Sequence, residues 1–374
     1  MPSSMNHFRS SIIQHSIILV IVAVVGGVVG SGTGSRSESD AVKVLGTTAL
    51  ASVSYKQADA TNQYRVYFQA ESGDLYQSVW SSGTKRWKTS PLRTSDATNV
   101  TEEPVAKLGT PLAAHIYGSV ETDYYEYHLF FLDAANRIWG LVSEDPDDIW
   151  KFSAENAIRG DYTTASYSKL ASYGRQCGGN CGNATSIVIW QSDDDNIWLA
   201  GYQPEIGWLA FANDAELDSP PVQGTAISTL SMGADEGLMS IYINTGRPTE
   251  LHFNRTDGWA SNGTLDGGTL QSDAAIAALI TNYDTADAGT AEVNVIATKP
   301  GSSGGVSLWL NGTFDSSWLN SDVEPPFSSV SNSSAITSNQ AGMVYAMERG
   351  KIAEWRWEDS NSSYIRVGIV ETHL

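Results

Sequence analysis

Three short strand-like segments recur in the same order six times along the chain, and this repeat constrains the fold more than any other feature. The first segment of a unit is rich in alanine and serine, as in "ALASVSY" and "PLAAHIY". The second, such as "YRVYFQ", is rich in the β-branched and aromatic residues that favour strands. The third follows a turn rich in Asp, Asn or Gly, and the unit returns about every 50–60 residues.

Each of the six units contains all three segments. The small-residue segments are residues 49–55, 111–117, 168–174, 225–231, 274–280 and 333–339. The second segments are residues 64–69, 127–132, 186–191, 238–243, 292–297 and 342–347. The third segments are residues 73–80, 136–142, 196–202, 249–253, 306–312 and 351–357. An aromatic residue closes the units: Trp87, Trp150, Trp208, Trp259, Trp318 and Tyr364.

Three strands and a closing fourth, repeated six times, predict an all-β, six-bladed β-propeller over residues 47–374. One such meander cannot bury both of its faces, whereas radially stacked meanders cover each other. Alanine and serine suit the narrow centre of the ring, and the bulkier second segment fills the layer between blades. We expect almost no helix, because no long segment of helical periodicity follows residue 40. A pair of β-sandwich domains is the alternative.

An apolar segment, residues 12–29, precedes the repeats. Arg9 lies before it, and the first acidic residue is Glu38. The segment approaches the roughly 20 residues that span a bilayer, so it predicts either an uncleaved single-pass transmembrane anchor or a signal peptide within residues 1–30. The lack of an Ala-x-Ala cleavage site favours the anchor. Residues 31–46 then read as a flexible linker, and both interpretations put the repeats on the extracellular or lumenal side, membrane-bound or secreted.

The N-glycosylation sequons and the two cysteines also indicate a protein of the secretory pathway. An N-glycosylation sequon demands a surface loop in a secretory compartment, and seven occur, at Asn99, Asn183, Asn254, Asn262, Asn311, Asn332 and Asn361. The two cysteines, Cys177 and Cys181, could close a tight-loop disulfide in an oxidising compartment. With six scattered histidines they offer no four-ligand zinc cluster, so we expect neither a metal nor a cofactor. The formal net charge of −20 repels phosphate backbones and argues against a nucleic-acid partner.

The first unit resembles a known family. "QYRVYFQAESGDLYQSVW", with the small-residue strand before it and the closing Trp87, is similar to the fungal fucose-specific lectins, the Aleuria-type six-bladed propellers. The resemblance covers about residues 47–370 and implies sugar pockets between adjacent blades. In that family an arginine of the second strand and a glutamate of the third hold the ring hydroxyls, and an aromatic of the following blade covers the apolar face of fucose. A guanidinium fork and a carboxylate suit that task.

The resemblance implies one pocket that keeps most of the pattern. In the first unit Arg65 retains the arginine position, Gln77 replaces the glutamate, and Trp150 is the aromatic from the next blade. In the sixth unit Glu354 matches the glutamate, whereas Met343 replaces the arginine. Trp87 completes the candidate carbohydrate-binding residues. The arginine and glutamate positions of the second to fourth units are occupied by His128 and Gly140, Ile187 and Leu199, and Met239 and His252. Those of the fifth unit are apolar or cannot be aligned.

These residues favour a non-enzymatic, glycan-binding propeller, lectin-like and possessing mostly degenerate pockets for fucosylated glycans. A second hypothesis is a protein-binding scaffold in which Arg65 only pairs with an acid such as Glu71 or Asp74 and the tryptophans only pack between blades. A third is a glycoside hydrolase, which needs two carboxylates within about 5–10 Å across the scissile bond. The acidic runs 143–148 and 192–195 look instead like solvated turns.

Overall fold

The computed structural model gives the fold of one compact unit, Asp40–Leu374. It describes residues 41–56, 61–92, 94, 104–119, 124–144, 149–174, 176–177, 186–203, 205–231, 239–254, 258–281, 292–300, 305–315, 327–332, 334–358 and 363–374. The apolar segment 12–29 lies outside these residues. Within them, no helix has the length and hydropathy that a membrane span requires.

The strands form six antiparallel sheets, here called blades 1 to 6 in chain order. Blade 1 contains β1 (Ala51–Lys56), β2 (Asn62–Gln69), β3 (Leu75–Ser81) and β4 (Arg86–Pro91). Blade 2 contains β5 (Ala113–Ser119), β6 (Tyr124–Leu132), β7 (Arg137–Ser143) and β8 (Arg159–Thr163), and β10 (Gln176–Cys177) pairs parallel with β5. Blade 3 contains β9 (Leu170–Gly174), β11 (Ser186–Gln191), β12 (Ile197–Gln203) and β13 (Gly207–Ala212).

The remaining blades repeat the same meander. Blade 4 contains β14 (Ile227–Ser231), β15 (Met239–Asn244), β16 (Pro248–Asn254) and β17 (Gly258–Thr264). Blade 5 contains β18 (Ile276–Thr281), β19 (Glu292–Thr298), β20 (Val306–Leu310) and β21 (Thr313–Phe314). Blade 6 contains β22 (Ile336–Ser338), β23 (Met343–Glu348), β24 (Lys351–Glu358) and β25 (Ser363–Ile369). All elements of the described chain are strands, and the three predicted segments of every unit coincide with its first three strands.

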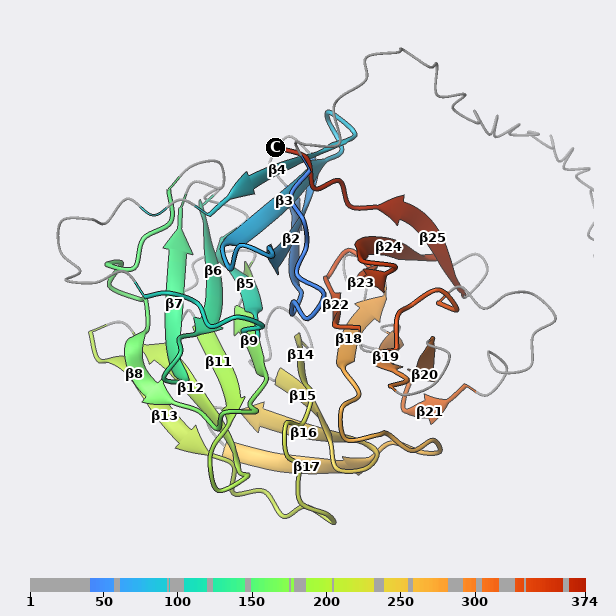
Figure 1. Ribbon diagram of the computed structural model, residues 1–374. Coiled ribbons are helices and arrows are strands. Elements are labelled where there is room, and N and C mark those ends of the chain that lie inside the picture. The colour runs from blue at the N-terminus through green and yellow to red at the C-terminus, as the bar shows by residue number, and fades with distance from the viewer. Residues whose placement is uncertain are drawn as a thin grey trace, which may run out of the picture. The chain divides into compact units, whose positions relative to one another are not determined.

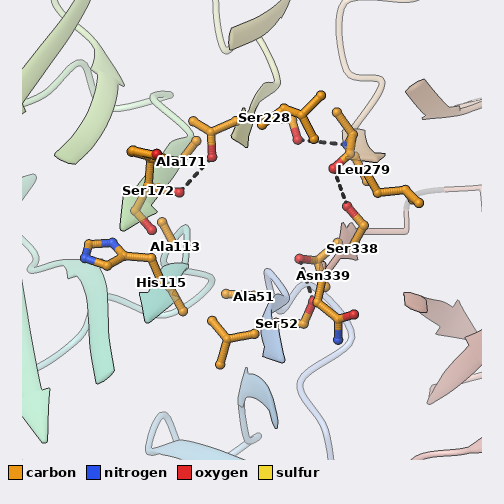
Figure 2. A pocket seen from close by; sticks show the side chains of 18 of the residues that line it. Ala51, Ser52, Ala113, His115, Ala171, Ser172, Ser228, Leu279, Ser338 and Asn339 are labelled. Carbon is orange, nitrogen blue, oxygen red and sulfur yellow. Dashed lines mark hydrogen bonds between the residues drawn. The ribbon is translucent and has the colours of Figure 1, made fainter. Parts of the chain in front are cut away.

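The six blades surround a common centre (Figure 1). Each inner strand contacts the inner strands of both neighbouring blades, which closes the ring from β1 through β5, β9, β14, β18 and β22 back to β1. Residues of all six inner strands line a central channel of about 170 Å³. Small side chains such as Ala51, Ala113 and Ala171 face it, as expected for the crowded axis (Figure 2). The six-bladed propeller is therefore confirmed, and the two-sandwich alternative is wrong.

One side-chain hydrogen bond recurs in five blades and defines their common register. A hydroxyl just before the inner strand accepts a backbone N–H at the end of the second strand, over 2.7–2.9 Å. The pairs are Gln69 with Thr48, Leu132 with Thr110, Gln191 with Ser168, Asn244 with Thr225 and Met347 with Ser334. Counting from these anchors shows which residues are equivalent in different blades.

The two ends of the propeller meet at blade 1. The Val42 amide donates to the Thr372 carbonyl over 2.8 Å, and Ala41 bridges His373. The Leu45 amide donates to the Gln69 carbonyl over 2.9 Å. Residues 41–46 were expected to belong to the linker, but they already pair with the propeller, because Val42 and its neighbours pack on apolar side chains of blades 1 and 6.

Candidate inter-blade sites

Closing aromatic residues of one blade pack against the second strand of the blade before it. The ring centroid of Trp150 lies 5.8 Å from that of Tyr67, Trp208 lies 5.9 Å from Phe130, and Trp87 lies 6.2 Å from Tyr345. Trp87 and Trp208 are in β4 and β13, as expected for a closing strand. Trp150 precedes β8, which begins only at Arg159, so the closing strand of blade 2 lies later than the sequence suggested. Trp318 lies outside the described residues.

The interface between blades 1 and 2 brings together the residues of the predicted pocket. The Arg65 Nη1 donates to Gln77 Oε1 over 3.1 Å, and Nη2 donates to Gln63 Oε1 over 3.3 Å. The guanidinium carbon lies 4.4 Å from the centroid of the Tyr127 ring, a cation–π geometry. Trp150 reaches the same interface from blade 2 through its contact with Tyr67. Arg65 thus bonds to neighbouring glutamines.

Protein atoms cover this set almost completely. The exposed fraction is 0% for Arg65, 3% for Gln77 and 1% for Trp150. The Tyr127 ring, also buried, lies over the guanidinium. Burial raises the pKa of both Tyr67 and Tyr127 above the usual phenol value, so both rings stay neutral next to the cation. A sugar could reach Arg65 only if one of these side chains moved.

The register corrects the expected equivalences in blade 4. Ser240, not Met239, occupies the position of Arg65, since Ser240 lies four residues before the anchor Asn244 as Arg65 does before Gln69. A shift of one residue moves a strand side chain to the other face, which is why Met239 is wrong.

The glutamate position of blade 4 also changes. It is Glu250, opposite Tyr242, as Gln77 is opposite Tyr67, and not His252. Glu250 lies six positions after Asn244, whereas Gln77 lies eight positions after Gln69. Because the turn of blade 4 is shorter, the equivalence of Glu250 and Gln77 cannot be recognised from sequence spacing. In blade 5 the second strand contributes Asn294, a buried amide that donates to the Tyr364 hydroxyl of blade 6 over 3.0 Å.

A tyrosine opposite a side-chain acceptor therefore recurs in three blades. The cross-strand pairs are Tyr67 with Gln77, Tyr242 with Glu250, and Tyr345 with Glu354. In the sequence this pairing corresponds to a tyrosine two or three residues before the end of the second strand.

The two glutamates differ in their protonation. Glu250 accepts hydrogen bonds from Tyr242, His252 and Asn262 over 3.0–3.2 Å. Burial alone would raise its pKa, but the bonds from His252 and Asn262 outweigh burial, so the pKa of Glu250 is lowered. Glu354 is 5% exposed and accepts a hydrogen bond from the Tyr345 hydroxyl over 3.4 Å. Burial raises its pKa to about 7.

The structure describes only some of the predicted glycosylation and disulfide residues. The sequon residues Asn262, Asn311 and Asn332 are exposed. Asn99, Asn183 and Asn361, the side chain of Asn254, and the side chains of Cys177 and Cys181 lie outside the described part of the chain. Among the residues that the structure describes, no three His, Cys, Asp or Glu side chains converge to hold a metal ion.

The fold defines a class: a six-bladed β-propeller of the type seen in fungal fucose-binding lectins. An Aleuria aurantia lectin variant in complex with α-methyl-L-fucoside superposes with a TM-score of 0.64 at 19% sequence identity, over 89% of this chain and 98% of that one. The protein AofleA from Arthrobotrys oligospora superposes with a TM-score of 0.57 at 16% identity, over 88% and 89% of the two chains. The predicted resemblance is thus confirmed for the fold. No protein-family model and no curated protein matches the sequence.

Proposed function

We propose that this chain is a non-enzymatic glycan-binding propeller whose ligands include fucosylated glycans. The observation that carries the proposal is the convergence of Arg65, Gln77 and Trp150 at the interface between blades 1 and 2. A guanidinium donates to ring hydroxyls, an amide oxygen accepts from them, and an aromatic face covers C–H groups. The choice of fucose as the ligand rests on the similarity of the fold to an Aleuria aurantia lectin variant that was solved with α-methyl-L-fucoside.

A sugar reaches the Arg65 guanidinium only by displacing protein groups. The Tyr127 ring covers the guanidinium, and two of the guanidinium N–H groups donate to Gln77 and Gln63. A sugar would replace the Gln63 bond and move the Tyr127 ring aside, which costs affinity. We therefore propose weak binding at this site. The interface between blades 6 and 1, where Trp87 packs on Tyr345 next to Glu354, is a second place for the same chemistry without an arginine.

Isothermal titration of the full chain with α-methyl-L-fucoside tests the proposal. Arg65→Ala should weaken binding by roughly ten- to a hundredfold, since a hydrogen bond to a charged group is worth roughly 1.5–3 kcal/mol. Gln77→Glu should strengthen it, because a carboxylate accepts hydroxyl hydrogens more strongly than an amide. Exposed Arg366, paired with Glu348, provides the control Arg366→Ala, which should leave binding unchanged. No titration signal at millimolar sugar for either wild type or Gln77→Glu would refute the proposal.

A protein-binding scaffold is the second candidate, and the complete burial of Arg65 favours it. In that case Arg65 is a structural residue that holds β2 to β3 through Gln77. The two candidates separate in the titration above: a scaffold binds no fucoside, although Arg65→Ala still lowers its stability.

We further propose that the propeller faces the extracellular or lumenal side, either anchored by residues 12–29 or secreted after cleavage. The apolar segment and the exposed sequons at Asn262, Asn311 and Asn332 support this location. N-terminal sequencing of the mature product separates the two forms: a start near Ser31 would mean cleavage.

A further inference from the structure

The interface between blades 2 and 3 contains a cavity of about 490 Å³ that differs chemically from the buried Arg65 niche. Its lining comes from the first three strands of blade 2, from the segment after Trp150, and from blade 3. The polar lining residues are Tyr117, Glu126, His128, Glu144, Lys151, Glu155, Asn156, Ser186, Tyr202 and Glu205. A cavity of this size can hold one or two sugar rings, since small-molecule sites measure about 300–1,000 Å³.

The charge of the lining is strongly unbalanced. Four carboxylates and one lysine line the cavity, so four negative charges minus one positive charge leave an excess of three. The field reaches the phenols that face it: burial first, and then Glu126, raise the pKa of Tyr117, while burial and then Glu155 and Glu126 raise that of Tyr202. Low-dielectric walls lined by one sign of charge concentrate ligands of the opposite sign. A cation is therefore favoured over the neutral or anionic sugars.

A buried histidine also lines the cavity. His128 lines the cavity and is 1% exposed, and its Nε2 lies 3.2 Å from Glu126 Oε2. Since a carboxylate only accepts, Nε2 carries the proton and Nδ1 of a neutral ring is an acceptor. Among the described residues that Nδ1 has no hydrogen-bond partner. Because Nδ1 is itself buried, a ligand donor reaches it only if a neighbouring side chain moves.

The rim of the cavity is held in place before any ligand arrives. Asn156 donates to Glu126 Oε2 over 2.6 Å, and the Trp208 indole donates to the Asn156 carbonyl over 3.1 Å. Arg159 donates to the carbonyls of Ser153 and Ala154 over 2.6 and 3.1 Å, which fastens the turn before Asn156. Such support lowers the ordering cost of binding.

We propose that this cavity binds a sugar that carries a free primary ammonium group, that is, a deacetylated 2-amino sugar. Glu126 and the exposed carboxylates Glu144 and Glu155 hold the ammonium group, while the hydroxyls of Tyr117 and Tyr202 bond to ring hydroxyls. A divalent metal is a poor alternative, because no metal-ligating cluster forms among the described residues. The inference rests on the proposed glycan-binding function but concerns a separate cavity with its own ligand class.

Isothermal titration of the full chain with the glucosamine trimer, the matched N-acetylglucosamine trimer and spermidine tests the inference. We expect the deacetylated trimer to bind at least about tenfold more tightly than the acetylated one, and raised salt to weaken it. Equal binding of both trimers would overturn the inference. Spermidine binding as tight as that of the glucosamine trimer would also overturn it, since the site would then recognise only charge.

Two variants and one control complete the test. Glu126→Gln should reduce glucosamine-trimer affinity about tenfold or more, because it removes the buried carboxylate. The double variant Glu144→Gln/Glu155→Gln changes only exposed side chains, so it keeps the test valid if Glu126→Gln unfolds the chain; it should weaken binding several-fold. Glu216→Gln, an exposed acid outside the cavity lining, is the matched control. Unchanged affinity in the double variant would refute the inference.

The two proposals fail separately. Loss of α-methyl-L-fucoside binding with retained glucosamine binding contradicts only the fucose assignment at Arg65. Fucoside binding without discrimination between the two trimers contradicts only the inference about the cavity.

Discussion

Tyr345 and Glu354 lie opposite each other on adjacent strands of blade 6, and the tyrosine hydroxyl donates to Glu354 Oε1 over 3.4 Å. Because the carboxyl is buried, its pKa rises from 4.5 to about 7. Near neutral pH this glutamate is therefore divided between its acid and carboxylate forms, unlike Glu250 at the equivalent position of blade 4.

Stability should fall between pH 5 and 8 on account of Glu354. The folded state binds this proton more tightly than the unfolded state, so the contribution is complete below a pH of about 4.5 and is lost as the pH rises to about 7. Glu354→Gln mimics the protonated acid, and at pH 8 it should exceed wild type in free energy of unfolding by about 1–3 kcal/mol. Urea denaturation at pH 5 and pH 8 measures this; a difference that does not grow with pH would contradict it.

Glu250 should show the opposite pH dependence. Its pKa is lower in the folded state, so its contribution is present above the unfolded value of 4.5 and is lost as the pH falls through the folded pKa. Glu250→Gln should therefore destabilise the protein at pH 7 and approach wild type in acid. The same denaturation series, with Glu216→Gln as an exposed control, tests the sign. A Glu250→Gln deficit that is larger at pH 3 than at pH 7 would be inconsistent with this assignment.

Gly174 should tolerate no side chain. A Cβ there would lie 2.4 Å from the Ile116 carbonyl oxygen and 2.2 Å from His115, on the adjacent inner strand. Gly174→Ala should thus force blades 2 and 3 apart and cost about 3 kcal/mol or more, whereas inserting one methyl group usually costs less. Gly201→Ala, whose Cβ would find its nearest neighbour at 3.7 Å, is the matched control in the same blade. Similar melting temperatures for the two variants would count against this packing.

Thr89→Val should weaken the closure of the ring. The Thr89 hydroxyl donates to the Glu371 carbonyl over 2.7 Å, and Ser78 donates to the same oxygen over 3.1 Å. Loss of one of the two bonds should cost about 1 kcal/mol and expose the C-terminal segment to carboxypeptidase. Thr313→Val, an exposed strand position, serves as control. Equal digestion rates for the two variants would show that the bond does not hold the terminus.

Glycans should be found on Asn311 and Asn332 when the chain is made in a eukaryotic secretory pathway. Both side chains are exposed and both lie in turns, where a transferase can reach them. Glycopeptide mass spectrometry of the purified protein checks the occupancy. Full-length protein without glycans at any sequon would contradict the proposed location.

The order of the strands could be predicted from the sequence because each signal is local. The small-residue segment "ALASVSY" and the apolar segment "YRVYFQ" needed no knowledge of their neighbours, and both became strands β1 and β2. Equivalent positions were harder to assign. The turn before Glu250 is shorter than the turn before Gln77. The equivalence of these two residues is therefore defined by their cross-strand pairing and not by their spacing in the sequence.

The number of blades and the strand order followed from the repeated sequence segments alone. Which inter-blade interfaces are closed and which contain a cavity became clear only from the packing of the blades. Tyr127 covers Arg65, whereas the segment around Asn156 leaves a cavity above His128. The physical reason is that the burial of Arg65 depends on Tyr127, a side chain of the neighbouring blade, and no local pattern in the sequence records that contact.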